Sequence, residues 1–347
     1  MISILGGGSW GLALAFVLNN NNVPVKVWAR DEKQVDIFNR EHTSKYFDSF
    51  VFPSSIKMTS SIDEALSNSD TLVLSVPVKA TVGLVESIKD KIHDKNVVLT
   101  AKGLDNGEIL SERLKPYISS LKLSVLSGPS FASEVIQKKT TCVVIASENS
   151  DLSKELQNDF SSDFFRVYTS DDVIGVELCG ALKNVYAIGS GFLDGKKVGY
   201  NTKASYLTRS LHELGNIVLN RGGKETTLLG LSGIGDLILT CTSPTSRNYS
   251  FGYNFNGDTT TAHTVEGLYT LPNILEMADK YKIDMPIVKA INSIIFNNEP
   301  VEEVIKRLMG RSKKSEEFHK KIINWLIPYL ILYVYGRINR LEKGIVP

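Results

Sequence analysis

Short apolar runs alternate with longer helical stretches along the first 170 residues of the chain. The runs are rich in β-branched residues and nearly free of charge, which is typical of strands buried on both faces of a sheet. Because the stretches between them are long enough for helices, the pattern predicts a mainly parallel sheet wrapped by helices. The expected strands span residues 2–5, 23–28, 71–76, 96–101, 123–126, 141–146 and 164–168.

After Asp171 the strand-like runs stop, and apolar residues recur at helical spacing. A further helix is expected between Pro300 and Gly310, with Lys306 and Arg307 in its last turn. We therefore expect an α/β domain at residues 1–175, an all-α domain at 176–315 and a C-terminal extension of unknown role at 316–347. The clearest helical stripes are Ala204, Leu207, Leu211, Leu214 and Val218, and Ile287, Val288, Ile291, Ile294 and Ile295.

The composition is that of a folded globular protein, with 42% hydrophobic and 22% charged residues in 347. The 39 Lys and Arg residues nearly balance the 38 Asp and Glu residues, so no overall field attracts nucleic acid or an acidic membrane. An anion must therefore be bound locally, by a few residues positioned at its binding site. The three cysteines, Cys142, Cys179 and Cys241, form no disulfide or zinc pattern, and the first residues show neither the basic n-region nor the long apolar h-region of a signal peptide. We expect a cytoplasmic protein.

A glycine-rich loop follows the first expected strand and precedes the helical run 12–18. Gly6, Gly8 and Gly11 match Gly-x-Gly-x-x-Gly, in which the first glycine allows a tight turn, the second a close approach of pyrophosphate, and the third close packing of helix on strand. The helix N-terminus adds free N–H groups and a positive dipole. An ordinary glycine turn is the alternative, but the flanking strands and helix favour a dinucleotide and a Rossmann-like N-terminal domain.

The end of the second expected strand bears on the choice of dinucleotide. Arg30 and Asp31 follow this strand in succession. An arginine here suits the 2′-phosphate of NADPH, whereas an acidic residue accepts a hydrogen bond from the ribose of NADH. Arg30 favours NADPH; the alternative is that Arg30 is solvated and Asp31 binds the ribose.

Lys183 is the only charged residue between Glu177 and Asp194, and Asp236 is the only one between Glu225 and Arg247. Burial would lower the pKa of Lys183 toward that of a general base, although its side chain could instead extend to the surface. A buried Asp236 needs a partner, for which Lys183 is the candidate; otherwise Asp236 caps a helix. Lys102 closes an expected strand at the sheet edge where ligands bind in such folds.

Two further segments are candidates for phosphate binding. Ser246, Arg247 and Asn248 offer a hydroxyl, a guanidinium and an amide, and Gly128 and Ser130 follow another expected strand. Either segment could be a plain turn. The five histidines are scattered, so neither a histidine base nor a metal site is expected; the candidate base is a lysine.

Together these motifs resemble the bacterial NAD(P)-dependent glycerol-3-phosphate dehydrogenases, in family order across about residues 1–315. The resemblance implies reversible reduction of dihydroxyacetone phosphate to sn-glycerol 3-phosphate for phospholipid synthesis, by NADPH or NADH, in a homodimer. The matching segments are GGGSWG (6–11), AKG (101–103), SGPS (127–130), FRVY (165–168), GALKNV (180–185), GDL (235–237), TCT (240–242), SRN (246–248) and VEG (265–267).

The resemblance also assigns roles to residues. Lys183 would be the proton acceptor. The implied substrate contacts are Lys102, Gly128, Ser130, Lys183, Asp236, Ser246, Arg247 and Asn248. The implied cofactor contacts, beside Gly6, Gly8 and Gly11, are Ser9, Trp10, Arg30, Phe47, Lys102, Ala132, Arg247, Thr264 and Glu266. Phe47 stands where the family often has Tyr, and Thr264 where it often has Val.

The chain continues past the family pattern through the apolar stretch 322–335, which Pro328 interrupts. It is shorter than the ~20 residues of a membrane span. We expect a packed or dimer-forming helix; an interfacial membrane anchor flanked by Lys320, Lys321, Arg337 and Arg340 is the alternative. Two other functions compete. One is a different two-domain dehydrogenase, for a hydroxy acid or for a sugar nucleotide, the latter with Cys241 as nucleophile. The other is a non-catalytic nucleotide sensor with a membrane-associating tail.

Overall fold

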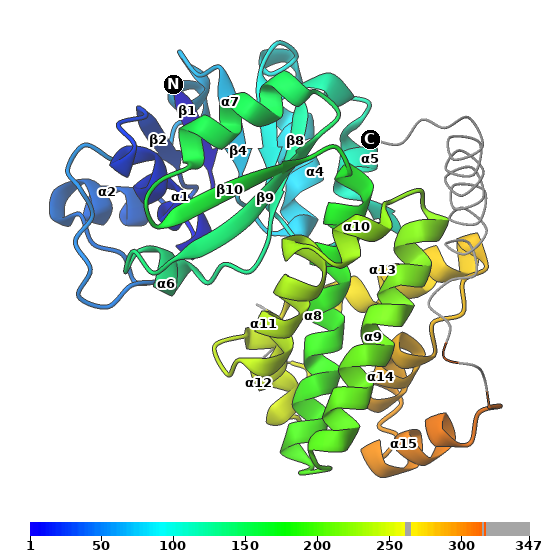
Figure 1. Ribbon diagram of the computed structural model, residues 1–347. Coiled ribbons are helices and arrows are strands. Elements are labelled where there is room, and N and C mark those ends of the chain that lie inside the picture. The colour runs from blue at the N-terminus through cyan, green and yellow to red at the C-terminus, as the bar shows by residue number, and fades with distance from the viewer. Residues whose placement is uncertain (261–264, 314–315, 317–347) are drawn as a thin grey trace, which may run out of the picture. The chain divides into compact units, whose positions relative to one another are not determined.

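An eight-stranded sheet forms the N-terminal half of the computed structural model, which describes residues 1–260, 265–313 and 316 (Figure 1). The strand order is β10-β9-β8-β5-β4-β1-β2-β3, and all neighbours are parallel except β8 and β9. The order reverses between β1 and β4, where doubly wound sheets bind ligands at the carboxyl ends of their strands. The strands are β1 (Ile2–Leu5), β2 (Val25–Trp28), β3 (Lys57–Thr59), β4 (Thr71–Leu74), β5 (Asn96–Leu99), β8 (Leu123–Ser127), β9 (Thr141–Ser147) and β10 (Phe165–Ser170).

Alternate residues of the central strands belong to two separate hydrophobic cores, because successive side chains of a strand point to opposite faces. Val98 of β5 lies in one core, and its neighbours Val97 and Leu99 lie in the other. The first core is covered by α1 (Ser9–Asn20), α2 (Glu32–Glu41), α6 (Ala132–Val135) and α7 (Ser150–Phe160). The second is covered by α3 (Ile62–Leu66), α4 (Val78–Ile88) and α5 (Leu110–Leu114).

Every strand expected from the hydrophobic pattern is present, and the mainly parallel sheet is confirmed. The pattern missed β3 and a small antiparallel hairpin of β6 (Leu104–Asp105) and β7 (Glu108–Ile109). These strands have only two or three residues, too few to produce a readable alternation.

Helices make up the second half of the chain, and no strand follows Ser170 in the described residues. At their centre lies α8 (Val173–Gly195), which contacts α9, α11, α12, α13 and α14. Apart from Glu177, Lys183, Asn184 and Asp194, its residues are apolar, aromatic or small, as a helix surrounded by other helices requires. The other helices are α9 (Tyr200–Asn220), α10 (Glu225–Leu228), α11 (Asp236–Thr242), α12 (Arg247–Tyr253), α13 (Glu266–Tyr281), α14 (Pro286–Phe296) and α15 (Val301–Met309).

Residues Met1–Ile305 pack as one unit, which contains the sheet and most of the helical half. The domain boundaries expected at residues 175 and 315 stay predictions. The apolar stretch 322–335 and its flanking basic residues lie outside the described residues. Within the described part of the chain, no helix is both long and apolar enough to cross a membrane.

Candidate active site

Three charged side chains from distant parts of the sequence meet beside α8. Asp236 accepts hydrogen bonds from both lysines: its Oδ1 lies 2.5 Å from the Nζ of Lys183, and its Oδ2 lies 2.7 Å from the Nζ of Lys102. The Asp236 side chain is fully buried, and those of Lys183 and Lys102 are 9% and 16% exposed. The expected ion pair between Asp236 and Lys183 is confirmed. Asp236 is the first residue of α11 and makes no side-chain cap, so the alternative of a capping aspartate is wrong.

The cluster lowers the pKa values of both Lys183 and Asp236, for different physical reasons. Burial lowers the pKa of Lys183 to about 8, and the charge of Lys102 acts in the same direction, while Asp236 opposes both. Burial alone would raise the pKa of Asp236, but the ammonium groups of Lys102 and Lys183 hold it below its usual range. Asp236 is therefore a carboxylate at neutral pH, beside a lysine that titrates near physiological pH. The expectation of a desolvated Lys183 is confirmed.

Thr240 is a third neighbour of Lys183, and the sequence reasoning gave it no role. Its Oγ1 accepts a hydrogen bond from Lys183 Nζ at 2.9 Å and donates to the carbonyl of Asp236 at 2.7 Å. The spacing of Thr240 from Asp236, one helical turn on α11, is the signal that could have identified it. An ammonium group has three N–H donors. Two N–H donors of Lys183 are used by Asp236 and Thr240, so one is left for a ligand.

Lys102 follows β5 and is anchored in the same way. Its Nζ donates to the carbonyl of Gly128 at 3.0 Å as well as to Asp236, which again leaves one donor. Gly128 follows β8, and Ser130 Oγ donates to the same Gly128 carbonyl at 3.0 Å. The expectation that the ends of β5 and β8 bring these residues together is confirmed, whereas their contact with substrate stays a prediction.

The Ser246–Asn248 segment lies at the start of α12. Its three side chains differ in whether their polar groups already have hydrogen-bond partners within the protein. Ser246 is buried and accepts a hydrogen bond from the Tyr249 N–H as the N-cap of α12. Asn248 is 8% exposed, and its amide is hydrogen-bonded within the protein. Arg247 is exposed and makes no hydrogen bond or ion pair with any described residue. Of the three side chains, Arg247 is the one available to bind an anion.

Glu266, the first residue of α13, lies close to this cluster. Burial raises the pKa of Glu266, against the opposing charges of Arg247, Lys183 and Lys102. Its Oε2 accepts a hydrogen bond from Asn184 Nδ2 at 3.4 Å, and Asn184 adjoins Lys183 on α8. Asn184 is a second residue to which the sequence reasoning gave no role.

The glycine loop fits the pyrophosphate of a dinucleotide. Gly6 has a φ of +134°, which favours glycine, and a Cβ at Gly11 would lie 2.0 Å from the Gly6 carbonyl oxygen. A Cβ at Gly8 would meet no atom within 4 Å, so the loop is open there. Gly8 is also the N-cap of α1 and provides no side-chain acceptor, which leaves the first N–H groups of this twelve-residue helix for an anion.

The other cofactor residues expected in the N-terminal half occupy several different elements. Arg30 is exposed after β2 and has no hydrogen-bond or ion-pair partner among the described residues, whereas Asp31 accepts from the Lys33 N–H as the N-cap of α2. Ser9 and Trp10 begin α1, and Ala132 begins α6. Phe47 is 6% exposed and packs edge-to-face against Phe52. Thr264 lies outside the described residues.

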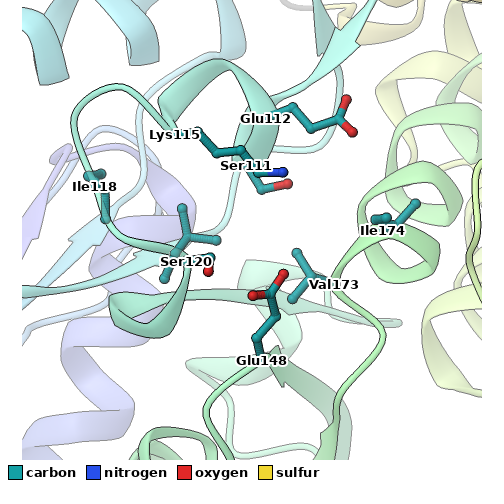
Figure 2. Close-up of a pocket in the computed structure, with 9 residues that line it drawn as sticks. Ser111, Glu112, Lys115, Ile118, Ser120, Glu148, Val173 and Ile174 are labelled. Carbon is teal, nitrogen blue, oxygen red and sulfur yellow. The ribbon is translucent and has the colours of Figure 1, made fainter.

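A small cavity near the ends of α5 and α8 does not belong to this site. Figure 2 shows its lining, which includes Ser111 and Glu112 of α5, Val173 and Ile174 of α8, and Glu148. Its volume is about 40 Å³, far below the several hundred Å³ of a typical ligand site. None of the expected site residues lines it. The described residues also contain no group of three or more His, Cys, Asp or Glu that could hold a metal ion.

Comparison with known proteins identifies the family. The model of the N-terminal part of NAD-dependent glycerol-3-phosphate dehydrogenase matches residues 1–153, and that of its C-terminal part matches residues 172–306. The chain belongs to this family. The fold, the NAD(P)-dependent dehydrogenase class and the resemblance read from the motifs are thereby confirmed.

Individual members of the family align with this chain over nearly their whole length. The NAD(P)+-dependent glycerol-3-phosphate dehydrogenases of Staphylococcus carnosus and Fusobacterium nucleatum are each 39% identical, over 91% of this chain and 99% and 98% of their own chains. The crystal structure of the glycerol-3-phosphate dehydrogenase of Coxiella burnetii is 35% identical. It covers 89% of this chain and 98% of its own, with a TM-score of 0.85.

Proposed function

We propose that this enzyme catalyses the reversible reduction of dihydroxyacetone phosphate to sn-glycerol 3-phosphate, with Lys183 as the group that exchanges the proton at the C2 oxygen. The observation that carries the proposal is the contact of Lys183, Asp236 and Lys102 at the carboxyl edge of the sheet. It supplies a proton donor of suitable pKa, a buried carboxylate that orients it and a second cation for the substrate oxygen.

The geometry of Lys183 supports this role. Asp236 and Thr240 take two donors of the Lys183 ammonium, so its third N–H is left to donate to the substrate. The bound nicotinamide supplies or accepts the hydride at C2. In reduction, Lys183 gives its proton to the C2 oxygen as the carbonyl becomes a hydroxyl; in oxidation, neutral Lys183 takes that proton back. Lys102 stabilises the negative charge that develops on the same oxygen.

Arg247 is the proposed ligand of the substrate phosphate. It is exposed, and it makes no hydrogen bond or ion pair with a described residue. A guanidinium group binds two phosphate oxygens at once, and this fixes the orientation of the substrate. With a net charge of only +1 on the whole protein, this local contact must provide most of the attraction for the phosphate.

We propose NADPH as the preferred cofactor. The glycine loop and the start of α1 would hold the pyrophosphate, and Arg30 would hold the 2′-phosphate. Two observations support this preference: Arg30 has no partner among the described residues, and Asp31 uses its carboxylate to cap α2. We further propose that the enzyme acts in the cytoplasm as a homodimer, in line with its near-neutral charge and three free cysteines.

The deciding experiment follows NADPH and NADH oxidation with dihydroxyacetone phosphate, each cofactor titrated separately. We expect turnover with both and a higher kcat/KM for NADPH; no turnover with either would refute the function. Lys183→Ala should keep NADPH binding and lose turnover by orders of magnitude, because it removes the group that exchanges the proton and leaves the glycine loop intact. Unchanged turnover in this variant would refute the role of Lys183. A protein that binds NADPH without turnover would be the nucleotide sensor.

A further inference from the structure

Asp172 connects two segments of the helical half that are far apart in sequence. It lies between β10 and α8, is 5% exposed and is the N-cap of α8. Its Oδ1 accepts a hydrogen bond from the Gly175 N–H in the first turn of α8, at 2.9 Å. Its Oδ2 accepts from the Lys224 N–H at 2.7 Å and from Thr227 Oγ1 at 2.6 Å. One buried carboxylate thus holds both the start of α8 and the α10 segment.

The backbones of these two segments are in direct contact at a pair of glycines. A Cβ at Gly223 would lie 3.0 Å from the Cα of Gly175 and 3.1 Å from its nitrogen. A Cβ at Gly175 would lie 2.1 Å from Asp172 Oδ2. Because neither position has room for a side chain, the chain that leads into α10 lies against the first turn of α8. This contact and the Asp172 carboxylate fix the position of α10 on α8.

The end of α10 in turn determines the path of the chain into Asp236. Residues Leu231–Gly235 form a single π-helical turn directly before Asp236, a feature frequent at functional sites. Gly233 in this turn has non-helical angles, with a φ of −86° and a ψ of −106°. A Cβ there would lie 2.3 Å from the Leu228 carbonyl oxygen and 2.5 Å from that of Thr227. The π turn, and with it Asp236, is therefore placed against the last carbonyls of α10.

The two segments that Asp172 connects carry the two partners of the buried ion pair. Lys183 lies about three turns into α8, and Asp236 follows the π turn. We propose that Asp172 is a positioning residue that, through Thr227, holds α10 on α8 and thereby sets the contact of Asp236 with Lys183. The proposal rests on the proposed function for the reaction in which this pair acts. The hydrogen bonds of the Asp172 side chain go to α8 and the α10 segment, so it acts on the pair through the backbone.

Thr227→Val tests the proposal with almost no change of shape. It removes the hydroxyl that bonds to Asp172, so we expect α10 and the π turn to move away from α8. Asp236 raises the pKa of Lys183, against burial and the charge of Lys102, so this pKa should fall below about 8 when Asp236 withdraws. The high-pH limb of the rate profile, where reduction of dihydroxyacetone phosphate falls off, should move to lower pH. We also expect kcat to fall roughly tenfold, because small displacements of catalytic groups are costly.

Two further variants act on the same chain of contacts. Asp172→Asn keeps one acceptor for α8 but turns an NH₂ group toward the Lys224 N–H, which can only donate. It should move the high-pH limb in the same direction as T227V. In D236N the carboxylate beside Lys183 is already absent, so adding T227V should not move the limb further, because both changes act on one contact.

Two controls separate this effect from a loss of stability. Thr208→Val is the matched substitution: Thr208 is exposed on α9, and its hydroxyl donates to the Ala204 carbonyl of the same helix. Its limb and kcat should equal those of the wild type. Asn149→Ala removes the N-cap of α7, which accepts from two backbone N–H groups, so its Tm should fall while the limb and kcat stay unchanged.

The pKa of Lys183 is also measured without substrate, by NMR titration of protein with isotope-labelled lysine and with Lys183→Arg to assign the signal. A limb and an NMR pKa in T227V that both match the wild type would overturn the proposal, whether or not the Tm falls. A further shift on adding T227V to D236N would overturn it as well. Should D172N fail to fold, as judged by circular dichroism, T227V decides. If the wild type does not reduce dihydroxyacetone phosphate, the proposed function fails, and the NMR pKa alone decides the role of Asp172.

Discussion

Replacing Asp236 by Asn removes the one negative charge that lies between two lysines while keeping the shape of the side chain. Asp236 is fully buried, and its two oxygens accept from Lys183 and Lys102 at 2.5 and 2.7 Å. In the variant, the NH₂ group faces one of these ammonium groups, donor against donor. Desolvation and the charge of Lys102 still lower the pKa of Lys183, but the opposing effect of Asp236 is lost, so this pKa falls below its value of about 8.

The expected loss of stability follows from the burial of the pair. Removing one partner of a buried ion pair costs about 3–5 kcal/mol. Lys102 is partly exposed, so we expect a value near 3 kcal/mol, which at about 2 °C per kcal/mol lowers the Tm by about 6 °C. Asp63→Asn is the matched control, because Asp63 and its partner Lys91 are 69% and 53% exposed. An exposed pair contributes about 0–1 kcal/mol, so the Tm of D63N should change by no more than about 2 °C.

The pH dependence of the rate tests the catalytic half of the reasoning. Reduction needs protonated Lys183, so the wild-type rate of dihydroxyacetone phosphate reduction should fall as the pH rises through about 8, and the rate of oxidation should rise over the same range. In D236N both limbs should move to lower pH, because the ammonium form has lost its stabilising carboxylate. The reasoning is refuted if D236N keeps the wild-type limbs, or if it melts at the same temperature as D63N.

Three further substitutions test single contacts. Arg247→Ala should lower kcat/KM for dihydroxyacetone phosphate by roughly 10–100-fold while leaving the slow reaction of phosphate-free dihydroxyacetone unchanged; an equal loss with both substrates would exclude Arg247 as the phosphate ligand. Arg30→Ala should raise the Kd for NADPH about tenfold and leave that for NADH within twofold, by calorimetry; equal changes would contradict a 2′-phosphate contact. Cys241→Ser should retain activity, because Cys241 is fully buried and burial raises the pKa of its thiol, so no thiolate nucleophile forms; loss of activity with an unchanged Tm would favour a cysteine-dependent mechanism.

The elements that depend on local pattern were predictable from the sequence. Burial on both faces selects apolar β-branched runs, so the main strands could be identified, whereas β3 and the β6–β7 hairpin were too short to show alternation. The glycine loop was equally readable, because the tight turn, the open backbone and the helix start all lie between Leu5 and Leu12.

The cluster of charges was predictable for a different reason. Lys183 and Asp236 each stand alone in an apolar segment, and a buried charge requires a partner of opposite sign. Their contact bridges 53 residues of sequence, and that of Asp236 with Lys102 bridges 134. No role could be assigned to Thr240 from the sequence, because a neutral hydroxyl does not require a partner of opposite charge when it is buried. Threonines at helical spacing are also common.

What the sequence by itself determined is therefore the class of fold, the nucleotide loop and the members of the charged cluster, because each follows from local backbone geometry or from the cost of burying a charge. Only the tertiary structure decided which way the polar side chains face. The Ser246–Asn248 segment offers a hydroxyl, a guanidinium and an amide in succession, and nothing in that order tells them apart. The packing of α12 on α8 and α13 does: it uses Ser246 as a cap, turns the Asn248 amide inward to Asn184 and Gly267, and leaves the Arg247 guanidinium facing outward.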